Sequence, residues 1–368
     1  MRDSGVAQRL AAVDAVRGLA ALAVVLFHVP AAVRDAAGIP RLLNAAFDAG
    51  YLGVDAFFVL SGFVISLSVA HGEWTPRYLV RFLARRSVRL DPAYWAVIAL
   101  EPLLGWIGFR FLGDQYTLPT LGGVLAHLVY LQDFLGLGQI SAVFWTLCFE
   151  VQFYLLLVGT LVLTTQLERR TGLSRRGVLA ATLLTLVGYS LLMRAGLAPK
   201  PLTGLMLERS YQFGLGIIAW LCASGRLAPR HALPLLGGIV VARAAAGSVL
   251  EALVIGGTTG VCWLSVRSAR LNQWADARPL QFLGRISYSL YLFHGVVLGR
   301  GATVWLMLVA GSPQLRALAL LGLVLLLAGS VLFAFVMYRL IEVPTLRLSR
   351  RIRLDRAVLA PTAVPVPV

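Results

Sequence analysis

The chain has 368 residues, of which 58% are hydrophobic and 14% charged, and its mean hydropathy is +0.79. Soluble domains contain roughly 45–50% apolar and about 25% charged residues, so this composition argues against a soluble globular protein. The formal net charge of +16 comes almost entirely from arginine, since Lys200 is the only lysine. The arginines lie in short segments between apolar runs, which indicates a membrane protein and no nucleic-acid partner.

Apolar runs long enough to cross a bilayer predict about ten transmembrane helices, because a span needs roughly 20 mostly apolar residues. The predicted spans cover residues 15–33, 52–71, 92–112, 145–165, 178–196, 204–223, 233–247, 249–266, 288–311 and 316–340. The N-terminal run continues to spanning length, which predicts a first transmembrane helix and no cleaved signal peptide. The Gly-rich stretch 119–135 is too short to cross and is interpreted as an interfacial or re-entrant segment.

The basic residues predict which side of the membrane each loop faces. With the N-terminus in the cytosol, the segments assigned to the cytosol contain 24 of the 33 Lys and Arg residues. Cytosolic loops carry an excess of these residues, so ten spans with both termini cytosolic are favoured. The predicted fold is an all-α membrane bundle with a cytosolic segment over 1–13, a transmembrane domain over 14–345 and a cytosolic tail over 346–368. The tail is basic and then Pro/Val-rich, a composition that predicts disorder.

The first span carries two ionisable residues, Arg17 and His28, in the run RGLAALAVVLFH. Eleven residues are about 16.5 Å and three turns of helix, so both side chains face one side. Arg17 is predicted at the cytosolic end and His28 deep in the membrane. Ionisable residues inside a membrane are functional candidates, and histidine is the usual general base near neutral pH. A histidine bonded to a neighbouring helix is the structural alternative.

The second span adds Asp55 and Ser61 in the run GYLGVDAFFVLSGFVIS. Asp55 is predicted at the outer end, where a carboxylate also suits a helix cap. Ser61 and Gly62 lie in mid-span, and small residues there also permit close helix packing.

A cluster of arginines follows in RFLARRSVRLDPAYW. Arg81, Arg85 and Arg89 recur every four residues and share one helical face, with Arg86 beside them. Such a face binds phosphates by forked, charge-assisted hydrogen bonds. Membrane topology and contacts with lipid headgroups explain a basic cluster equally well.

Glu150, in FWTLCFEVQFYLL, is a carboxylate predicted near the outer end of the fourth span. It needs a partner there, and the expected choices are His28, a proton, or an intramembrane arginine such as Arg243 or Arg300. His294, in LGRISYSLYLFHGVV, is a further candidate, with a hydrogen bond across helices as its structural alternative. Three cysteines without CxxC spacing predict neither disulfides nor a metal site.

These segments together resemble the acyltransferase 3 family of multi-spanning membrane acyltransferases. VDAVRGLAALAVVLFH is similar to its first-helix signature, including Asp14, and GVDAFFVLSGFVIS to its second. Arg86 and Arg89 fit its Arg-x-x-Arg pattern, and the segments around Glu150 and His294, with IEVP near the C-terminal end, match its later motifs. The resemblance covers about residues 11–345. Thr146 and Cys148 replace the usual serines, and Val151 replaces a common second Glu.

The resemblance implies transfer of an acyl group, usually acetyl, from cytosolic acyl-CoA to a hydroxyl of a surface glycan or of a macrolide-type metabolite. Arg17, Arg85, Arg86 and Arg89 are then expected to hold the phosphates of CoA. His28 either deprotonates the acceptor or carries the acyl group transiently, and Glu150 either orients His28 or balances its charge. The competing interpretation is a transporter or flippase for a glycan or lipid. The partners expected are the bilayer of the cell membrane and the acceptor, and the oligomeric state is undefined.

Overall fold

The computed structural model describes residues 10–112, 117–200, 202 and 204–355 of the chain. Helices account for all of the regular secondary structure in these residues. The fold class predicted from composition and periodicity is therefore confirmed as all-α. Most of the predicted cytosolic segment 1–13 and the Pro/Val-rich end of the predicted tail lie outside the described residues.

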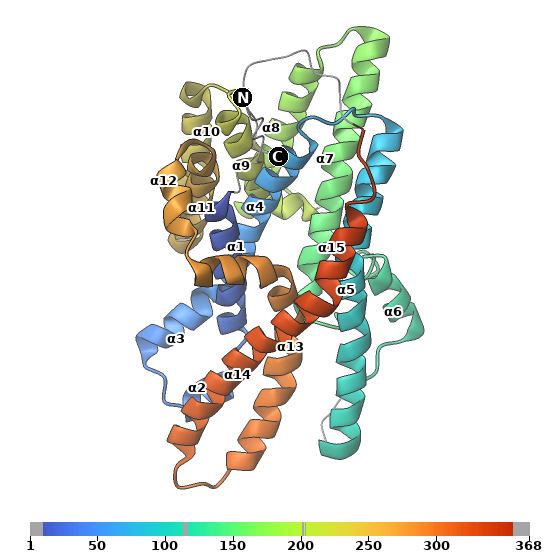
Figure 1. Ribbon diagram of the computed structural model, residues 1–368. Coiled ribbons are helices and arrows are strands. Elements are labelled where there is room, and N and C mark those ends of the chain that lie inside the picture. Colours follow the sequence, from blue (N-terminus) through green and yellow to red (C-terminus); the bar gives the residue numbers. More distant parts are fainter. Residues whose placement is uncertain (1–9, 113–116, 201, 203, 356–368) are drawn as a thin grey trace, which may run out of the picture.

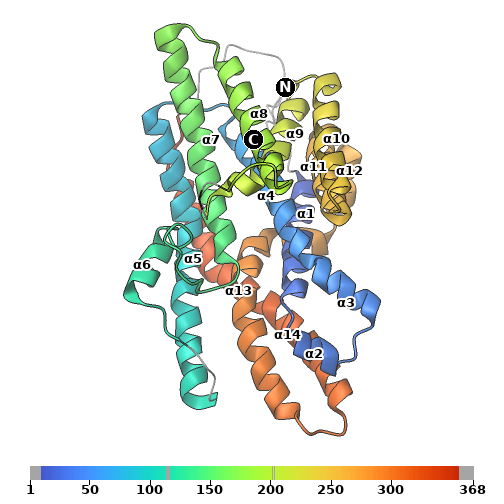
Figure 2. The ribbon, with the colours of Figure 1, turned by 180° about the vertical axis from the view of Figure 1, so that it is seen from behind.

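The helices follow one another in the order shown in Figures 1 and 2. The first half of the chain forms α1 (Ala11–Phe27), α2 (Ala31–Ala36), α3 (Arg41–Asp48), the 3-10 turn η1 (Ala49–Tyr51), α4 (Leu52–Val69), α5 (Pro76–Leu112), α6 (Leu121–Leu128) and α7 (Phe144–Thr171). The second half forms α8 (Arg175–Arg194), η2 (Met206–Arg209), α9 (Ser210–Ala223), α10 (Pro229–Ala245), α11 (Val249–Arg267), α12 (Ala269–Ala275), α13 (Arg278–Val309), α14 (Leu315–Met337), the π-helical turn η3 (Tyr338–Glu342) and α15 (Val343–Ser349).

Seven helical segments of the described chain are long and apolar enough to cross a bilayer. They are Arg41–Val69, Pro76–Phe111, Phe144–Thr171, Arg175–Arg194, Val249–Arg267, Arg278–Val309 and Leu315–Ser349. Helices also occur at the other three predicted spans, but α1, α9 and α10 have 17, 14 and 17 residues. The protein is an integral membrane protein by this measure, and the count of ten spans stays a prediction.

Two predicted boundaries are wrong. The first span was expected to reach residue 33, but α1 ends at Phe27, and Pro30 precedes the separate helix α2. The third span was expected to begin at residue 92, yet α5 runs unbroken from Pro76 through Pro92 and Pro102. Proline removes one main-chain donor and usually ends a soluble helix. Inside a membrane bundle, neighbouring helices and local adjustments compensate for it.

Glycine pairs set the closest helix crossings. A Cβ at Gly18 of α1 would lie 2.6 Å from the main-chain nitrogen of Gly284 on α13. A Cβ at Gly216 of α9 would lie 2.0 Å from the carbonyl oxygen of Val59 on α4, beside Gly62. Small residues let backbones approach in this way where lipid provides no hydrophobic driving force. The packing role considered for Gly62 is thus confirmed, and α1, α4, α9 and α13 form the closely packed centre of the bundle.

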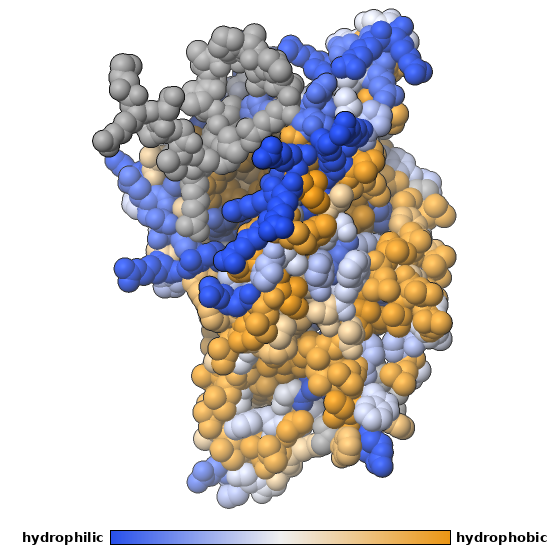
Figure 3. Space-filling model, turned by 45° about the vertical axis from the view of Figure 1, so that its right-hand side comes forward, coloured by the Kyte–Doolittle hydropathy of each residue, from blue (hydrophilic) through white to orange (hydrophobic). Residues whose placement is uncertain are grey.

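The sides of the molecule are apolar. Figure 3 shows hydrophobic residues covering most of the visible side, below a strongly hydrophilic upper end. Exposed leucines such as Leu163 on α7 and Leu332 on α14, at 66% and 64% exposure, belong to this surface. An apolar belt of this kind is stable against lipid and unstable against water, which agrees with the membrane assignment.

The start of the C-terminal tail is packed against the bundle. Helix α15 extends past the expected domain limit at residue 345. The Arg81 guanidinium donates to the Asp355 carboxylate at 2.5 Å, and the main-chain N–H of Glu73 donates to the Asp355 carbonyl at 3.1 Å. Residues of the predicted tail up to Asp355 therefore contact the bundle, and the domain boundary at 345 stays a prediction.

Candidate active site

Three arginines meet at one end of a cavity of about 110 Å³. Arg17 comes from α1, and Arg86 and Arg89 come from adjacent turns of α5. The Arg86 guanidinium lies over the rings of Phe82 and Tyr154, 5.5 and 5.4 Å from their centroids. The Nε of Arg89 is buried without a hydrogen-bond partner. This end of the cavity concentrates positive charge with donor capacity still open.

The other predicted arginines lie elsewhere. Arg81 is bonded to Asp355, and Arg85 is not among the residues that line the cavity. Arg86 and Arg89, which are three residues apart, both line the cavity. The helix face predicted to bind phosphate, that of Arg81, Arg85 and Arg89, is therefore not the face that lines it. Spacings of three and of four residues both place side chains on one helix face, and in this bundle the pair spaced by three residues faces the cavity.

Glu342 balances this charge and was not singled out as a site residue from the sequence. It lies on the π-helical turn η3, is 5% exposed, and its Oε2 accepts a hydrogen bond from Ser289 Oγ at 2.9 Å. Arg89 and Arg17 interact with it electrostatically. Single π-helical turns are frequent at functional sites. Its sequence signal was the IEVP segment directly after the last apolar run.

Glu150 lines the same cavity from α7. Its Oε1 accepts hydrogen bonds from Ser61 Oγ at 3.1 Å and from the Tyr154 hydroxyl. Two of the partners considered from the sequence, His28 and Arg243, bond elsewhere: His28 bonds the carbonyl of Val24, and Arg243 pairs with Glu251. Ser61, a candidate from the second span, is thus a direct partner of Glu150.

Arg300, the other arginine considered for Glu150, interacts electrostatically with Glu101 on α5 instead. Glu101 also approaches α13, because a Cβ at Gly295 would lie 3.4 Å from its Oε1. This carboxylate was not considered from the sequence.

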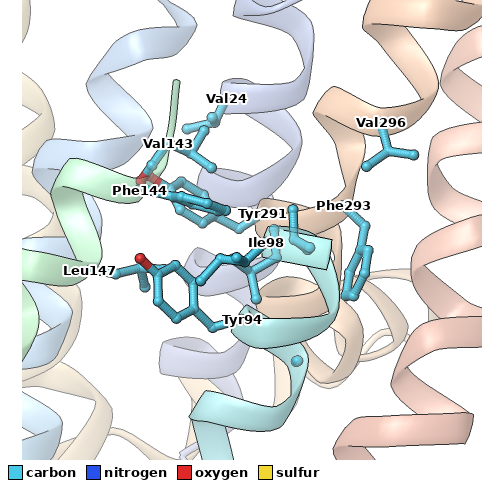
Figure 4. Close-up of a cluster of buried hydrophobic side chains, with 12 residues drawn as sticks. Val24, Tyr94, Ile98, Val143, Phe144, Leu147, Tyr291, Phe293 and Val296 are labelled. Atoms are coloured by element: carbon cyan, nitrogen blue, oxygen red, sulfur yellow. The ribbon is translucent and has the colours of Figure 1, made fainter. Parts of the chain in front are cut away.

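Tyr291 and Thr146 form the far end of the cavity. Their hydroxyl oxygens are 2.6 Å apart, and the Tyr291 ring meets Phe57 edge-on at 5.4 Å between centroids. Figure 4 shows Tyr291 beside Phe144 within the buried cluster that also holds Leu147 and Val143. Behind Tyr291 lies His294, with 6.3 Å between the ring centroids.

His28 and His294 form a pair beyond Tyr291, with ring centroids 4.9 Å apart. His28 Nδ1 is 2.8 Å from the carbonyl of Val24, and His294 Nδ1 is 3.1 Å from the carbonyl of Leu290. A carbonyl only accepts, so both Nδ1 atoms carry a proton, and in the neutral form of each ring Nε2 keeps its lone pair. The Nε2 of His294 is buried without a partner.

Arg17 and His28 were predicted to face the same side of the first helix, but only one of them lines the cavity. Arg17 lines it, whereas His28, the C-cap of α1, is not among its lining residues. Tyr291 lines the cavity on that side, and the His294 ring lies behind it. The cavity and the histidine pair are adjacent parts of one site separated by the Tyr291 ring.

His127 shows what a structural histidine looks like in this protein. Its Nδ1 bonds the carbonyl of Gly123 at 2.7 Å, and its Nε2 accepts from the N–H of Ile140 at 3.2 Å. Both ring nitrogens are used and the side chain is fully buried. The buried Nε2 of His294, which has no hydrogen-bond partner, therefore sets His294 apart from His127.

Asp55 is an ion-pair partner, and no side-chain cap bond forms at the start of its helix α4. It is 2% exposed, and its Oδ1 accepts from Arg209 at 2.7 Å and from Gln212 at 2.6 Å. Asp14 lies in the first turn of α1, where its main chain meets Gly284. Neither carboxylate lines the cavity, so their observed contacts are between helices.

Residues 10–339 match the family model described as an acyltransferase domain, acyltransferase 3. The chain belongs to the acyltransferase 3 family. It is 30% identical over 310 residues to BcsY of Komagataeibacter xylinus, whose name describes a membrane-bound transacylase, covering 77% of this chain and 71% of BcsY. It is 28% identical over 324 residues to the exopolysaccharide production protein ExoZ of Rhizobium meliloti, covering 83% and 92% of the two chains.

The peptidoglycan O-acetyltransferase OatA of Listeria monocytogenes is 24% identical over 318 residues, covering 77% of this chain and 48% of OatA. This acyltransferase 3 chain therefore spans about half the length of OatA. No solved structure matches it. The family assignment makes the protein a membrane acyltransferase, and it agrees with the resemblance carried by the sequence motifs. Within the described residues, no group of three or more His, Cys, Asp or Glu is arranged to hold a metal ion.

Proposed function

We propose that this acyltransferase moves an acyl group, normally acetyl, from cytosolic acyl-CoA to a hydroxyl of a surface-glycan sugar. The observation that supports acyl-CoA as the donor is that Arg17, Arg86 and Arg89 meet at one end of the cavity. Arginine forks match phosphate geometry and bind it by charge-assisted hydrogen bonds. The acceptor class is supported by OatA and ExoZ, whose names refer to peptidoglycan and exopolysaccharide.

The proposal places the protein in the cell membrane with ten spans and both termini in the cytosol. In that orientation Arg17 and the arginines of α5 face the compartment that supplies CoA. The pantetheine arm runs through the cavity from the arginines toward Thr146 and Tyr291. The thioester reaches the histidine pair by passing the Tyr291 ring.

In the chemical step, the Nε2 of His28 removes the proton from the acceptor hydroxyl. The oxygen attacks the thioester carbonyl, an oxygen–carbon bond forms, and the carbon–sulfur bond breaks. The proton then passes to the CoA thiolate, which leaves as the thiol. The ring centroids of His28 and His294 are 4.9 Å apart, and the Nε2 of His294 is buried without a partner. While the His28 ring is charged, this Nε2 accepts a hydrogen bond from it.

The test uses membranes containing the full chain, supplied with acetyl-CoA and an O-deacetylated glycan. Free CoA is expected to appear together with ester on the glycan. His28→Ala should lower this turnover about 10²–10⁴-fold, the range of a general base, with the protein still inserted. His231→Ala, at an exposed histidine, is the control and should keep full activity. Normal turnover in His28→Ala would rule out His28 as the general base. If the unmodified protein released no CoA, the transporter interpretation would be favoured instead.

A further inference from the structure

A second cavity, of about 360 Å³, lies between α5 and α7 where the segment after α6 packs against them. These three helices lie together on the right of Figure 1 and the left of Figure 2. The inner wall of the second cavity is shared with the arginine cavity, since both are lined by Arg86, Leu90, Leu147, Glu150, Tyr154 and Tyr288. The two spaces are therefore adjacent, with this set of side chains between them.

The outer wall of the second cavity faces lipid. Trp95 on α5, Val129 after α6 and Leu155 on α7 line it and are 43%, 59% and 47% exposed. Both α5 and α7 belong to candidate membrane spans. Large apolar side chains exposed in a span lie against the bilayer, so this cavity is a groove at the protein–lipid boundary.

The polar groups in the groove are largely satisfied by one another. Asp91 accepts hydrogen bonds from the Ser87 hydroxyl and, at 2.8 Å, from the Tyr130 hydroxyl. Tyr288 donates to the carbonyl of Leu90 at 2.9 Å. Apart from Arg86, Glu150 and Tyr154 on the shared inner wall, the other lining side chains, such as Val151, are apolar, so a ligand on the outer side of the groove gains chiefly by burying hydrocarbon.

We propose that this groove binds the hydrocarbon chain of the acyl donor, so that the enzyme accepts acyl groups longer than acetyl. The inference rests on the proposed function, because it needs CoA held at the arginines next to the shared wall. A chain that leaves the thioester sideways past Leu147 enters the groove. The groove walls carry two carboxylates, Asp91 and Glu150, and one arginine, Arg86, which the proposed function assigns to the phosphates of CoA, so they offer a lipid phosphate no net positive charge and favour a neutral chain.

The experiment measures CoA release by the full chain in membranes with acetyl-, butyryl-, hexanoyl- and octanoyl-CoA. Each methylene buried contributes about fourfold in binding, so kcat/KM should rise with chain length until the groove is filled. Leu155→Trp fills the groove from α7 and should lower kcat/KM for octanoyl-CoA at least about tenfold, with acetyl transfer unchanged. Val129→Trp, from the opposite wall, should act in the same direction.

Leu163→Trp is the matched control, because Leu163 lies on the same helix, is 66% exposed and lines neither cavity. It should leave the chain-length profile unchanged. Transfer of acetyl alone, or a profile that neither groove-filling tryptophan alters, would overturn the inference while leaving the proposed function intact. Absence of CoA release from every donor would overturn both.

Discussion

His28 on α1 and His294 on α13 face each other with 4.9 Å between ring centroids, and each donates its Nδ1 proton to a carbonyl of its own helix. A ring that becomes charged at His28 then has a lone pair of His294 beside it. This geometry predicts a positioning role for His294 that a purely structural histidine such as His127 does not have.

His294→Ala should lower kcat for acyl transfer about 10-fold or more, because the charged His28 ring loses its hydrogen-bond acceptor. His294→Gln, which places an amide oxygen near the position of Nε2, should recover part of this activity. The KM for acyl-CoA should stay unchanged in both variants. Full activity of His294→Ala, or equal losses in both variants, would contradict the positioning role.

Arg89→Ala should raise the KM for acyl-CoA about 10-fold, with a smaller effect on kcat, because one phosphate loses a charge-assisted donor. Arg81→Ala is the control on the same helix, since Arg81 is bonded to Asp355 and does not line the cavity. Steady-state kinetics against acyl-CoA separate the two. An unchanged KM in Arg89→Ala would show that this arginine does not bind CoA and would favour a role in membrane topology only.

Gly18→Leu should destabilise the protein strongly, because even a Cβ at this position lies 2.6 Å from the backbone of Gly284. Gly159→Leu on α7 is the control, since a Cβ there meets nothing within 4 Å. Thermal unfolding in detergent is the measurement. Equal unfolding temperatures of the two variants would show that the α1–α13 crossing tolerates a side chain.

Arg243 and Glu251 form a buried ion pair, 4% and 6% exposed, with 2.8 Å between Nη2 and Oε2. Arg243→Met should cost about 3–5 kcal/mol, because it leaves the Glu251 carboxylate without its closest positive charge. The double variant with Glu251→Met should recover much of this loss. Thermal unfolding of both variants gives the comparison, and a double variant less stable than Arg243→Met would count against the charge argument.

Much of the fold was predictable because hydropathy responds directly to the bilayer. The apolar runs located the helices, and the motif around Arg17 and His28 located two groups of the site. Helix ends were harder to place, since Pro30 ends the first helical region while Pro92 leaves α5 continuous. Whether a proline interrupts a membrane helix depends on neighbours that a single segment does not contain.

The pairings inside the bundle were mostly not predictable. Glu150 was expected to bond His28 or an arginine and instead bonds Ser61 and Tyr154. A lone carboxylate in a span shows that a partner exists, but the identity of that partner depends on helix rotation. The role of Glu342 was missed for the same reason, since its arginine neighbours are more than 250 residues away in the sequence.

The crossing of Gly18 with Gly284 joins α1 and α13 along the segments that carry Arg17, His28 and His294. Because the two backbones touch at that point, α1 and α13 are expected to move together as one rigid unit. The two histidines, one on each helix, then keep their separation. Helix α7 makes fewer close backbone approaches to α4 and α5 than α1 makes to α13. Rearrangements that admit substrates would therefore fall to α7 and its flanks, and mutations there would change entry rates before they disturb the reacting groups.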